Sequence, residues 1–535
     1  MTKDIDFMAH VDETTPPEIM LKMLLAAQRD KLKTNEEISY LKANRFGKSS
    51  EKGSKIKPDN QVFDEAKASP KDLLSDDVIV QDAGEKLEGS TIKIALKEAT
   101  RLAGKKGRKP IPAQYFREDV IHDLKEEEKM CTCGMHMKNI GEDVAEQLDV
   151  IPAKIYVKRH KRQKYACKKC QENVKIAPIQ TQTIAKCMAA PGLLAHVAIM
   201  KFDDHLPLYR QSEIWGRLGV DISRQTLSSW VLKMGSSLDV IAQHLQKHII
   251  KSGYVKADET TAQVLKTPGK KNKSASYIWT YLTGNAKQPA VVYDYQQTRH
   301  GQFAKDFLSG FTGVLQTDGY SGYHCITKEK AVHAMGCWAH ARRKFYDVAH
   351  LTKTEGVASK AVRIIGQLYG IEDEIKGLTS REKHAIRQEN SKPILEAFHE
   401  YLREIKPYAQ PKGMLDKAVA YTLNQWDSLI YYLRDGAVNI DNNAAERQIR
   451  PFAIGRKNWL FMGSPDGAKA GAVLYSLIET AKLNDVNPEG YLKFLLEHAI
   501  DPDADEELLE KLMPWNAKIP EDYPKPSHKI TENTS

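Results

Sequence analysis

The chain has 535 residues, and 41% of them are hydrophobic, so it is long enough to form several compact domains. Its formal net charge of +9 fits a nucleic-acid partner, whose phosphates are negatively charged. No apolar run reaches the roughly 18 residues of a membrane span, and the charged N-terminus lacks a signal-peptide core. We therefore expect a cytoplasmic protein with no membrane partner, and the seven cysteines, four of them in two close pairs, suit metal binding better than disulfides.

The first part of the chain predicts a helix followed by a linker. An apolar stripe within residues 1–47 indicates an N-terminal helix, which either dimerises or packs on its own chain. Residues 48–103 are dominated by Lys, Asp, Ser and Gly and predict a disordered linker.

Residues 104–125 form a basic ribbon. Arg108 and Lys109 stand directly before Pro110, and a residue that precedes proline is held in an extended conformation. Such a ribbon can place Arg108 and Lys109 on DNA, with Arg108 in a narrow A·T-rich minor groove, or it can be a linker without a partner.

Residues 126–175 predict a small zinc-ribbon-like β module. Two close cysteine pairs, Cys131 with Cys133 and Cys167 with Cys170, bracket a strand-rich stretch. Four thiolates suit a structural, tetrahedral Zn²⁺. The first pair is one residue shorter than the usual C-x-x-C, so the alternatives are a His136 ligand or a fold that carries free thiols.

Residues 176–250 predict a helical region with a helix-turn-helix-like pattern. The expected helices are 206–218 and 223–234, joined at Gly219, and Ser223 is a favourable N-cap. Arg224 and Gln225 would then face outward and could contact DNA, although helix–Gly–helix patterns also occur in ordinary bundles.

Residues 251–350 predict the first part of an α/β core. Four β-like runs (254–257, 277–283, 290–295 and 313–316) and a helix at 301–309 match the opening of an RNase H-like fold. Asp258 is expected to end the first strand and Asp318 the fourth. These strands are neighbours in that fold, so the two carboxylates would lie close together.

The rest of the chain is predicted to be mainly helical. Residues 351–437 are expected to form a long helical insertion, and 438–463 a core helix that carries Glu446 one turn before Arg450. Asp441 is a rival third carboxylate that we interpret as the helix cap. A helical pair is expected at 464–500, followed by a tail at 501–535 that is polar after Pro514.

Asp258, Asp318 and Glu446 together suggest a catalytic metal site. Two strand-borne aspartates and a helical glutamate suit two Mg²⁺ ions, with Mn²⁺ as a possible substitute, because hard cations prefer oxygen ligands. Two such ions can stabilise both the attacking and the leaving oxygen of a phosphoryl transfer. The alternative is that these acids are ordinary turn or cap residues.

Several other residues are candidates near this site. His340 and Arg343 could contact DNA phosphate or orient a carboxylate, whereas Cys337 and its neighbours are more typical of packing than of a second metal site. Arg456 and Lys457 could clamp the DNA backbone beside a base-stacking Trp459, which could equally be a core residue. Arg450 is a further candidate for a DNA contact.

Distinctive local sequences carry a family resemblance across nearly the whole chain. They occur at residues 45–52, 107–110, 164–170, 257–260, 317–320, 337–345 and 442–451, including A-D-E-T, T-D-G-Y, C-W-A-H-A-R-R-K-F and N-N-A-A-E-R-Q-I-R-P. In this order they resemble the DDE transposases of the bacterial insertion-sequence sixty-six (TnpC-type) family. That family carries C-x-x-C where this chain has Cys131 and Cys133, so the first pair is the weaker half of the zinc site.

The resemblance implies a DNA transposase that binds terminal inverted repeats, cleaves phosphodiester bonds and joins the 3′ ends to target DNA. Asp258, Asp318 and Glu446 would be its catalytic triad. A homo-oligomer and small accessory proteins of the same element are implied as partners. The alternatives are a catalytically inactive DNA-binding regulator and an RNase H-like nuclease that cuts without strand transfer.

Overall fold

The computed structural model describes residues 135, 155–166, 174–178, 183–184, 187–352, 356–498, 500–519 and 523. The predicted N-terminal helix, the linker, Arg108, Lys109 and the cysteines 131, 133, 167 and 170 lie outside the described residues. The chain divides into two compact units, residues 1–74 with 164–535 and residues 75–163, and nearly all described residues belong to the first.

The first described elements are a short hairpin and four helices. Strands β1 (Lys164–Ala166) and β2 (Val174–Ile176) pair antiparallel, with Tyr165 opposite Lys175. The helices that follow are α3 (Pro191–Phe202), α4 (Leu208–Arg217), α5 (Arg224–Ser237) and α6 (Asp239–Lys251).

The predicted helix pair is present as α4 and α5, with shifted ends. Ser223 is confirmed as the N-cap of α5, because its side chain accepts a hydrogen bond from the Thr226 N–H at 3.1 Å. Helix α4 begins at Leu208 rather than at residue 206, with Pro207 as its N-cap. Gly219 links the helices at a φ of +80°, a conformation that glycine adopts without strain.

A mixed five-stranded sheet forms the centre of the α/β region. It consists of β3 (Tyr254–Gln263), β4 (Ala275–Thr283), β5 (Val291–Gln296), β6 (Gly313–Gln316) and β7 (Val332–Met335). The order is β5-β4-β3-β6-β7; the β3–β4 and β4–β5 pairs are antiparallel, and β3–β6 and β6–β7 are parallel. Helix α7 (Gly301–Phe307) connects β5 to β6.

The first strand is longer than the sequence predicted, so the expectation that Asp258 ends it is wrong. Strand β3 continues to Gln263, and Asp258 pairs with Thr280 in the middle of the β3–β4 ladder. The β-branched Thr260 and Thr261 favour strand conformation, and they pair with Ile278 and Tyr277 on β4. Because this stretch is polar, the sequence did not indicate that the strand continues through it.

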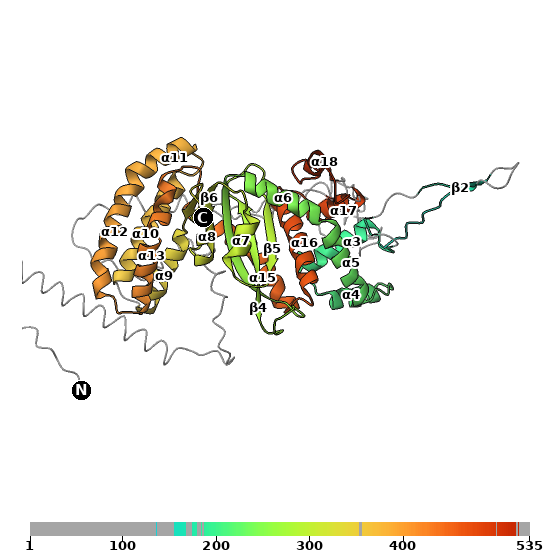
Figure 1. Cartoon of the computed structure of the whole chain (residues 1–535), viewed down its shortest axis with the longest axis horizontal. Helices are drawn as coiled ribbons and strands as arrows, with labels where there is room; N and C mark the ends of the chain where they lie inside the picture. The colour runs from blue at the N-terminus through green and yellow to red at the C-terminus, as the bar shows by residue number, and fades with distance from the viewer. Residues whose placement is uncertain are drawn as a thin grey trace, which may run out of the picture. The chain divides into compact units, whose positions relative to one another are not determined.

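The segment between β7 and the core helix contains a second hydrophobic core. After α8 (His324–Thr327) and α9 (Trp338–Thr352) come α10 (Val357–Glu374), α11 (Ser380–Ile386), α12 (Lys392–Ile405), α13 (Met414–Asn424) and α14 (Trp426–Leu429). Figure 1 shows α10, α12 and α13 beside one another, and buried Ile365, Phe398 and Val419 belong to their shared core.

The C-terminal helices pack on the sheet. They are α15 (Asn443–Trp459), α16 (Pro465–Leu483), α17 (Pro488–His498) and α18 (Glu506–Lys511). Helix α16 runs beside β5 (Figure 1), where Thr480 Oγ1 accepts the Val291 N–H at 3.1 Å and Ser476 Oγ the Tyr293 N–H at 2.9 Å. These bonds cover an edge strand that would otherwise be free to pair.

The prediction of a tail at 501–535 is wrong for its first part. Residues 500–519 are described and include α18, and Leu509, Leu512 and Met513 are buried. These apolar residues recur at helical spacing within an acidic stretch, and burial of that stripe holds the segment on the body. Among the described helices, none is both long and apolar enough to cross a bilayer.

Candidate carboxylate active site

Asp258 lies at the centre of β3 and is half-buried. Its Oδ1 accepts the Glu259 N–H at 2.8 Å. Because side chains alternate along a strand, Lys256 and Thr260 share its face, whereas Glu259 faces the other way. Lys256 is buried, with its Nζ 3.4 Å from the Asp441 carbonyl oxygen, and burial lowers its pKa to about 8.

Asp318 follows β6, the parallel neighbour of β3. Lys256 pairs with Gln316 in this ladder, so the chain delivers Asp318 beside Asp258. The Asp318 Oδ1 accepts the Tyr320 N–H at 2.8 Å, and its carbonyl oxygen accepts the Tyr421 hydroxyl at 2.6 Å. Gly319 has a φ of +87°, and a Cβ there would lie 2.9 Å from the Gln425 side chain, so the turn requires glycine.

Glu446 lies in the first turn of α15. The start of that helix is held by Asn442, which is fully buried: its Nδ2 donates to the Ala257 carbonyl at 3.0 Å and its N–H to Cys337 Sγ at 3.2 Å. Asn442 therefore ties Glu446 to the strand that carries Asp258.

Asp441 was predicted to be the helix cap, and this is wrong by one residue. The cap position is Asn442, which makes no side-chain capping bond. The Asp441 carboxylate instead accepts the Asn443 N–H at 3.1 Å and the Asn443 Nδ2 at 2.9 Å, which is a local turn. Asn442 is drawn away from capping because its side chain bonds to β3.

The three carboxylates influence one another electrostatically, although their oxygens do not all lie within 4.8 Å of one another. Burial raises the pKa of Asp258 well above its usual range, and the charges of Glu259, Asp318 and Glu446 add to that rise. Burial also raises the pKa of Glu446. The charges of Asp441 and Asp318 add to this rise, whereas His340 and Arg343 oppose it. Like charges gathered in a partly buried place favour a cation.

His340 lies next to the third carboxylate. Its Nδ1 is 3.6 Å from Glu446 Oε1, too long for a hydrogen bond. Cys337, His340 and Glu446 offer ligand atoms within 4.8 Å of one another, the one such group that the described residues contain. Burial raises the pKa of the Cys337 thiol, which disfavours the thiolate that a metal needs. Packing therefore remains the better interpretation of Cys337.

Glu259 is engaged on the opposite face. The Arg299 Nε donates to Glu259 Oε1 at 2.6 Å and the Tyr323 hydroxyl to Oε2 at 2.7 Å. The guanidinium of Arg299 also stacks 3.7 Å from the centre of the Tyr320 ring. This cluster contacts the turn after Asp318 from the face of the sheet opposite to Asp258.

The predicted DNA contacts fall into separate places. Arg224 and Gln225 are exposed at the start of α5, and Arg343 and Arg450 are half-buried on α9 and α15. Lys457 is exposed near the end of α15.

The basic end of α15 differs from the predicted clamp. Arg456 Nη1 donates to Thr260 Oγ1 at 3.2 Å and to Thr261 Oγ1 at 3.0 Å, so it ties α15 to β3. Trp459 packs edge-on against Phe452 with ring centres 5.4 Å apart, and it borders the core. The core interpretation of Trp459 is therefore favoured over the base-stacking one.

Sequence reasoning missed Tyr421 and Asn442. Tyr421 comes from the helical segment and holds the Asp318 backbone, and no local motif marks it. Asn442 was visible in the N-N-A-A-E stretch but was assigned to the first helical turn. A buried network was missed too: Tyr254 Oη donates to Gln316 Oε1 at 2.7 Å, and the Asn439 N–H donates to Tyr254 Oη at 3.2 Å.

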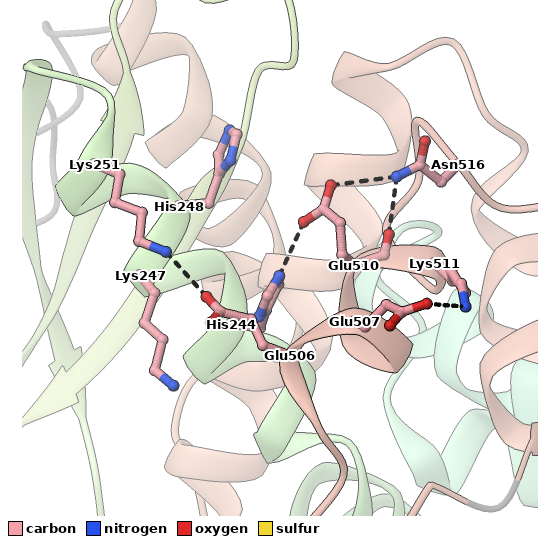
Figure 2. Close-up of a pocket in the computed structure, with 9 residues that line it drawn as sticks. All are labelled: His244, Lys247, His248, Lys251, Glu506, Glu507, Glu510, Lys511 and Asn516. Atoms are coloured by element: carbon pink, nitrogen blue, oxygen red, sulfur yellow. Dashed lines mark hydrogen bonds and ion pairs between the residues drawn. The ribbon is translucent and has the colours of Figure 1, made fainter.

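A charged groove of about 610 Å³ lies elsewhere, between α6 and α18 (Figure 2). Its walls are joined by ion pairs from Lys251 to Glu506 at 2.9 Å and from His244 to Glu510 at 3.0 Å. None of its lining residues belongs to the carboxylate cluster. We interpret this groove as the packing interface between α18 and α6.

Comparison with known proteins places the chain in a family. The profile described as Transposase IS66 family matches residues 186–470, the zinc-finger binding domain of transposase IS66 matches 128–171, and the IS66 C-terminal element matches 476–515. The second match spans all four predicted zinc cysteines, and the third spans α18.

Relatives align with most of the chain. Uncharacterized protein y4jD of Sinorhizobium fredii is 33% identical over 494 residues, covering 90% of this chain and 94% of that protein. Uncharacterized protein y4qI of the same organism is 34% identical over 437 residues, covering 79% and 80%. No solved structure matches. A family profile over more than half of the chain, in order with its zinc-finger and C-terminal elements, shows that the chain belongs to the IS66 family of transposases.

Proposed function

We propose that the chain is a DDE transposase that cleaves the ends of its element and joins the freed 3′-OH groups to target DNA. The observation that carries this proposal is the convergence of Asp258, Asp318 and Glu446 from β3, β6 and α15, with burial and mutual charge raising the pKa of Asp258 and Glu446. The strand order, three antiparallel strands followed by two parallel ones, supports an RNase H-like core.

The donor set fits a pair of Mg²⁺ ions. Three carboxylates are gathered with the charge of Arg343 as partial compensation, and hard oxygen ligands are what Mg²⁺ prefers. When bound, such ions activate water and stabilise the charge that develops during an in-line displacement. Asp258, Asp318 and Glu446 would hold them.

The chain's own residues would position this chemistry. Asn442 and the Asp318 turn fix the carboxylates relative to the sheet, so little rearrangement is needed when DNA arrives. Hydrolysis of one phosphodiester frees a 3′-OH, and that hydroxyl then attacks the phosphorus of a phosphodiester in target DNA, where a new P–O bond forms as the bond to the target strand's 3′-oxygen breaks. Neither step needs a covalent link between protein and DNA.

A structural zinc site is the second part of the proposal. The family zinc-finger match over 128–171 supports Cys131, Cys133, Cys167 and Cys170 as its ligands. Purified protein should carry about one Zn²⁺ per chain, and Cys167→Ser should lose it. Fresh protein without zinc by elemental analysis would overturn this assignment while leaving the carboxylate site untouched.

The test of catalysis is incubation of the full-length protein with duplexes of the element ends and Mg²⁺, with nicking and joining scored separately. Asp258→Asn, Asp318→Asn and Glu446→Gln should each abolish both products but leave DNA affinity nearly unchanged, because each removes one charged ligand at constant volume. Asp294→Asn makes the same chemical change on β5, away from the cluster, and should retain activity.

The outcomes separate the alternatives. Nicking without joining by the wild type would indicate a nuclease without strand transfer. Binding without either product would indicate a regulator. Wild-type activity in any one triad variant would remove that residue from the site.

A further inference from the structure

The turn that follows α15 is strained. Leu460 has φ +63° and ψ −49°, and the Phe461 N–H donates to the Trp459 carbonyl at 2.8 Å. A hydrogen bond across one residue at a positive φ is a γ-turn of the rare, strained hand. Glycine adopts such a φ easily, but leucine does not, and strained backbone persists where the surroundings enforce it.

This turn presents its two apolar side chains to solvent. Leu460 is 64% exposed and Phe461 47% exposed, although Trp459 before them and Met462 after them pack against the core. Hiding one of these side chains would remove apolar surface from water. The chain instead holds both outward in a conformation that costs energy.

The turn is also fixed rigidly to the catalytic sheet. The Met462 N–H donates to the Gln263 carbonyl at 2.9 Å, and the Leu265 N–H donates to the Met462 carbonyl at 2.9 Å. Val264 and Met462 form a parallel bridge. The side chains of Leu460 and Phe461 are therefore carried on a firm base at the end of the strand that bears Asp258.

The surface beside the turn is strongly basic. The connection between β3 and β4 contains Lys266, Lys270, Lys271 and Lys273 and no acidic residue. The Lys270 Nζ points back to the Ala275 carbonyl at 3.3 Å, whereas Lys266, Lys271 and Lys273 are exposed. Lys457 is exposed one turn before Phe461. An apolar pair bordered by several cations complements the stacked bases and phosphates of DNA.

We propose that Leu460 and Phe461 form a wedge that inserts at a base step of duplex DNA and unstacks it, while the lysines of residues 266–273 hold the flanking phosphates. Apolar wedges of this kind partially unstack and kink DNA. This inference rests on the proposed DNA-cleaving function and adds a distortion site to it.

The position of the wedge relative to Asp258 predicts which base step is distorted. Gln263, which anchors the turn, lies five residues beyond Asp258 on β3. At about 3.3 Å per residue this is about 17 Å, or about five base steps at 3.4 Å each. With the DNA axis placed parallel to β3 and the cleaved phosphate beside Asp258, we expect the distorted step to lie about five base pairs from that phosphate.

The test uses element-end duplexes in which 2-aminopurine replaces one base at a time within ten base pairs of the cleaved phosphate. Its fluorescence rises when stacking is lost. Binding is followed in parallel by anisotropy, without Mg²⁺ so that no cleavage occurs. Wild-type protein should raise fluorescence several-fold at one or two adjacent positions near the fifth base pair.

Two variants remove the wedge, and two more serve as controls. Phe461→Ala and Leu460→Gly should each reduce the fluorescence rise at least five-fold, with a smaller loss of affinity. Leu460→Gly should not lower the thermal midpoint, since glycine accepts the positive φ, so misfolding cannot explain its effect. Leu378→Ala and Tyr408→Ala remove side chains that are each 40% exposed in the helical segment, and they should leave the rise unchanged.

Each remaining outcome decides the matter. Binding with no local rise, or a rise that both wedge variants retain, overturns the wedge and leaves the transposase proposal standing. Unstacking without cleavage on later addition of Mg²⁺ supports the wedge and overturns the catalytic proposal. No duplex binding overturns both. If the variants only convert a dimer to monomers in sedimentation, the turn is a contact between copies of the chain.

Discussion

Two groups of buried charges in this protein are built in opposite ways. In the helical segment, Arg387 is 1% exposed, and its Nε and Nη2 donate to both oxygens of Glu372 at 2.8 and 2.6 Å. Its remaining donors reach the carbonyls of Tyr432, Asp435 and Val438 at 2.9–3.0 Å. Every N–H of that guanidinium has a partner.

The carboxylate cluster is left short of positive charge. Burial is the main cause of the raised pKa values of Asp258 and Glu446, and the neighbouring carboxylates, which are only partly compensated by positive charge, add to the rise. In the Arg387 group every charge is paired, so the group stabilises the folded chain by itself. The carboxylate cluster is not fully paired, so it stabilises the folded chain only when a ligand of opposite charge is bound. The contrast separates a structural ion pair from a candidate binding site without reference to sequence motifs.

Removing Arg387 from its ion-pair group should produce the largest change in stability. Arg387→Met leaves Glu372 and three carbonyls without their donor, so we expect the free energy of unfolding to fall by about 3–5 kcal/mol. Arg381→Met, at an exposed position of α11, is the matched control and should change it by less than about 0.5 kcal/mol. Urea unfolding measures both, and equal effects would show that the Arg387 pair is not special.

Removing one charge from the carboxylate cluster should change the free energy of unfolding in the opposite direction. Without divalent metal, Asp258→Asn should raise the free energy of unfolding at pH 7.5 by on the order of 1–3 kcal/mol, because an unpaired buried charge is removed. The pKa of Asp258 is raised on folding, so its ionisation destabilises the folded state as pH rises, and the gain should shrink at pH 4.

Added Mg²⁺ sharpens the same comparison. It should stabilise the wild type and have little effect on Asp258→Asn, because the variant lacks one charged ligand. Thermal melts with and without Mg²⁺ measure this difference. A variant that is less stable than the wild type without metal would mean that the cluster is already compensated.

Asp294 offers an intermediate case with a defined pH window. Burial raises its pKa from 3.8 to about 6, opposed by the Gln296 amide at 2.8 Å and by Lys469. The folded state therefore binds its proton more tightly, and stability is lost as pH rises from about 4 through 6. Asp294→Asn should gain about 1–3 kcal/mol at pH 7.5, discounted for partial exposure, and little at pH 4. A gain equal at both pH values would contradict the assignment.

The smallest expected effect belongs to Asp441→Asn. Asparagine keeps one acceptor for the Asn443 N–H, and the helix start is held by Asn442 instead. We expect less than about 1 kcal/mol of destabilisation and near-normal cleavage. Loss of cleavage comparable to that of Glu446→Gln would make Asp441 the third carboxylate.

The sequence predicted features that are written in consecutive residues. The apolar runs gave four of the five strands of the sheet, and Ser223 gave the start of α5, because each depends on its neighbours along the chain. Asp258 was placed at a strand end because the β-like run was taken to stop at residue 257, and the pairing of Thr260 and Thr261 with β4 shows that the strand continues.

Features that depend on distant residues could not be predicted. Nothing near Arg387 indicates that Glu372 and Val438 will surround it, and nothing near Tyr421 points to Asp318. Residues 501–535 were predicted to be a tail, although the spacing of Leu509, Leu512 and Met513 carried the signal for burial. The sequence analysis did not single out Leu460 and Phe461, because the exposure of two apolar residues at the end of a helix depends on the backbone conformation of the turn.

The helical segment leaves and rejoins the sheet at almost one point. Trp338 Nε1 donates to the Leu429 carbonyl at 2.9 Å, and the Gly336 N–H donates to the Ser428 carbonyl at 2.9 Å. Its helices have local contacts and a core of their own, so they can form early, and doing so shortens the loop that β3 must close with α15. On this order of folding, Glu446 joins Asp258 and Asp318 only after the helical segment has formed, so a partly folded chain lacks the complete carboxylate cluster.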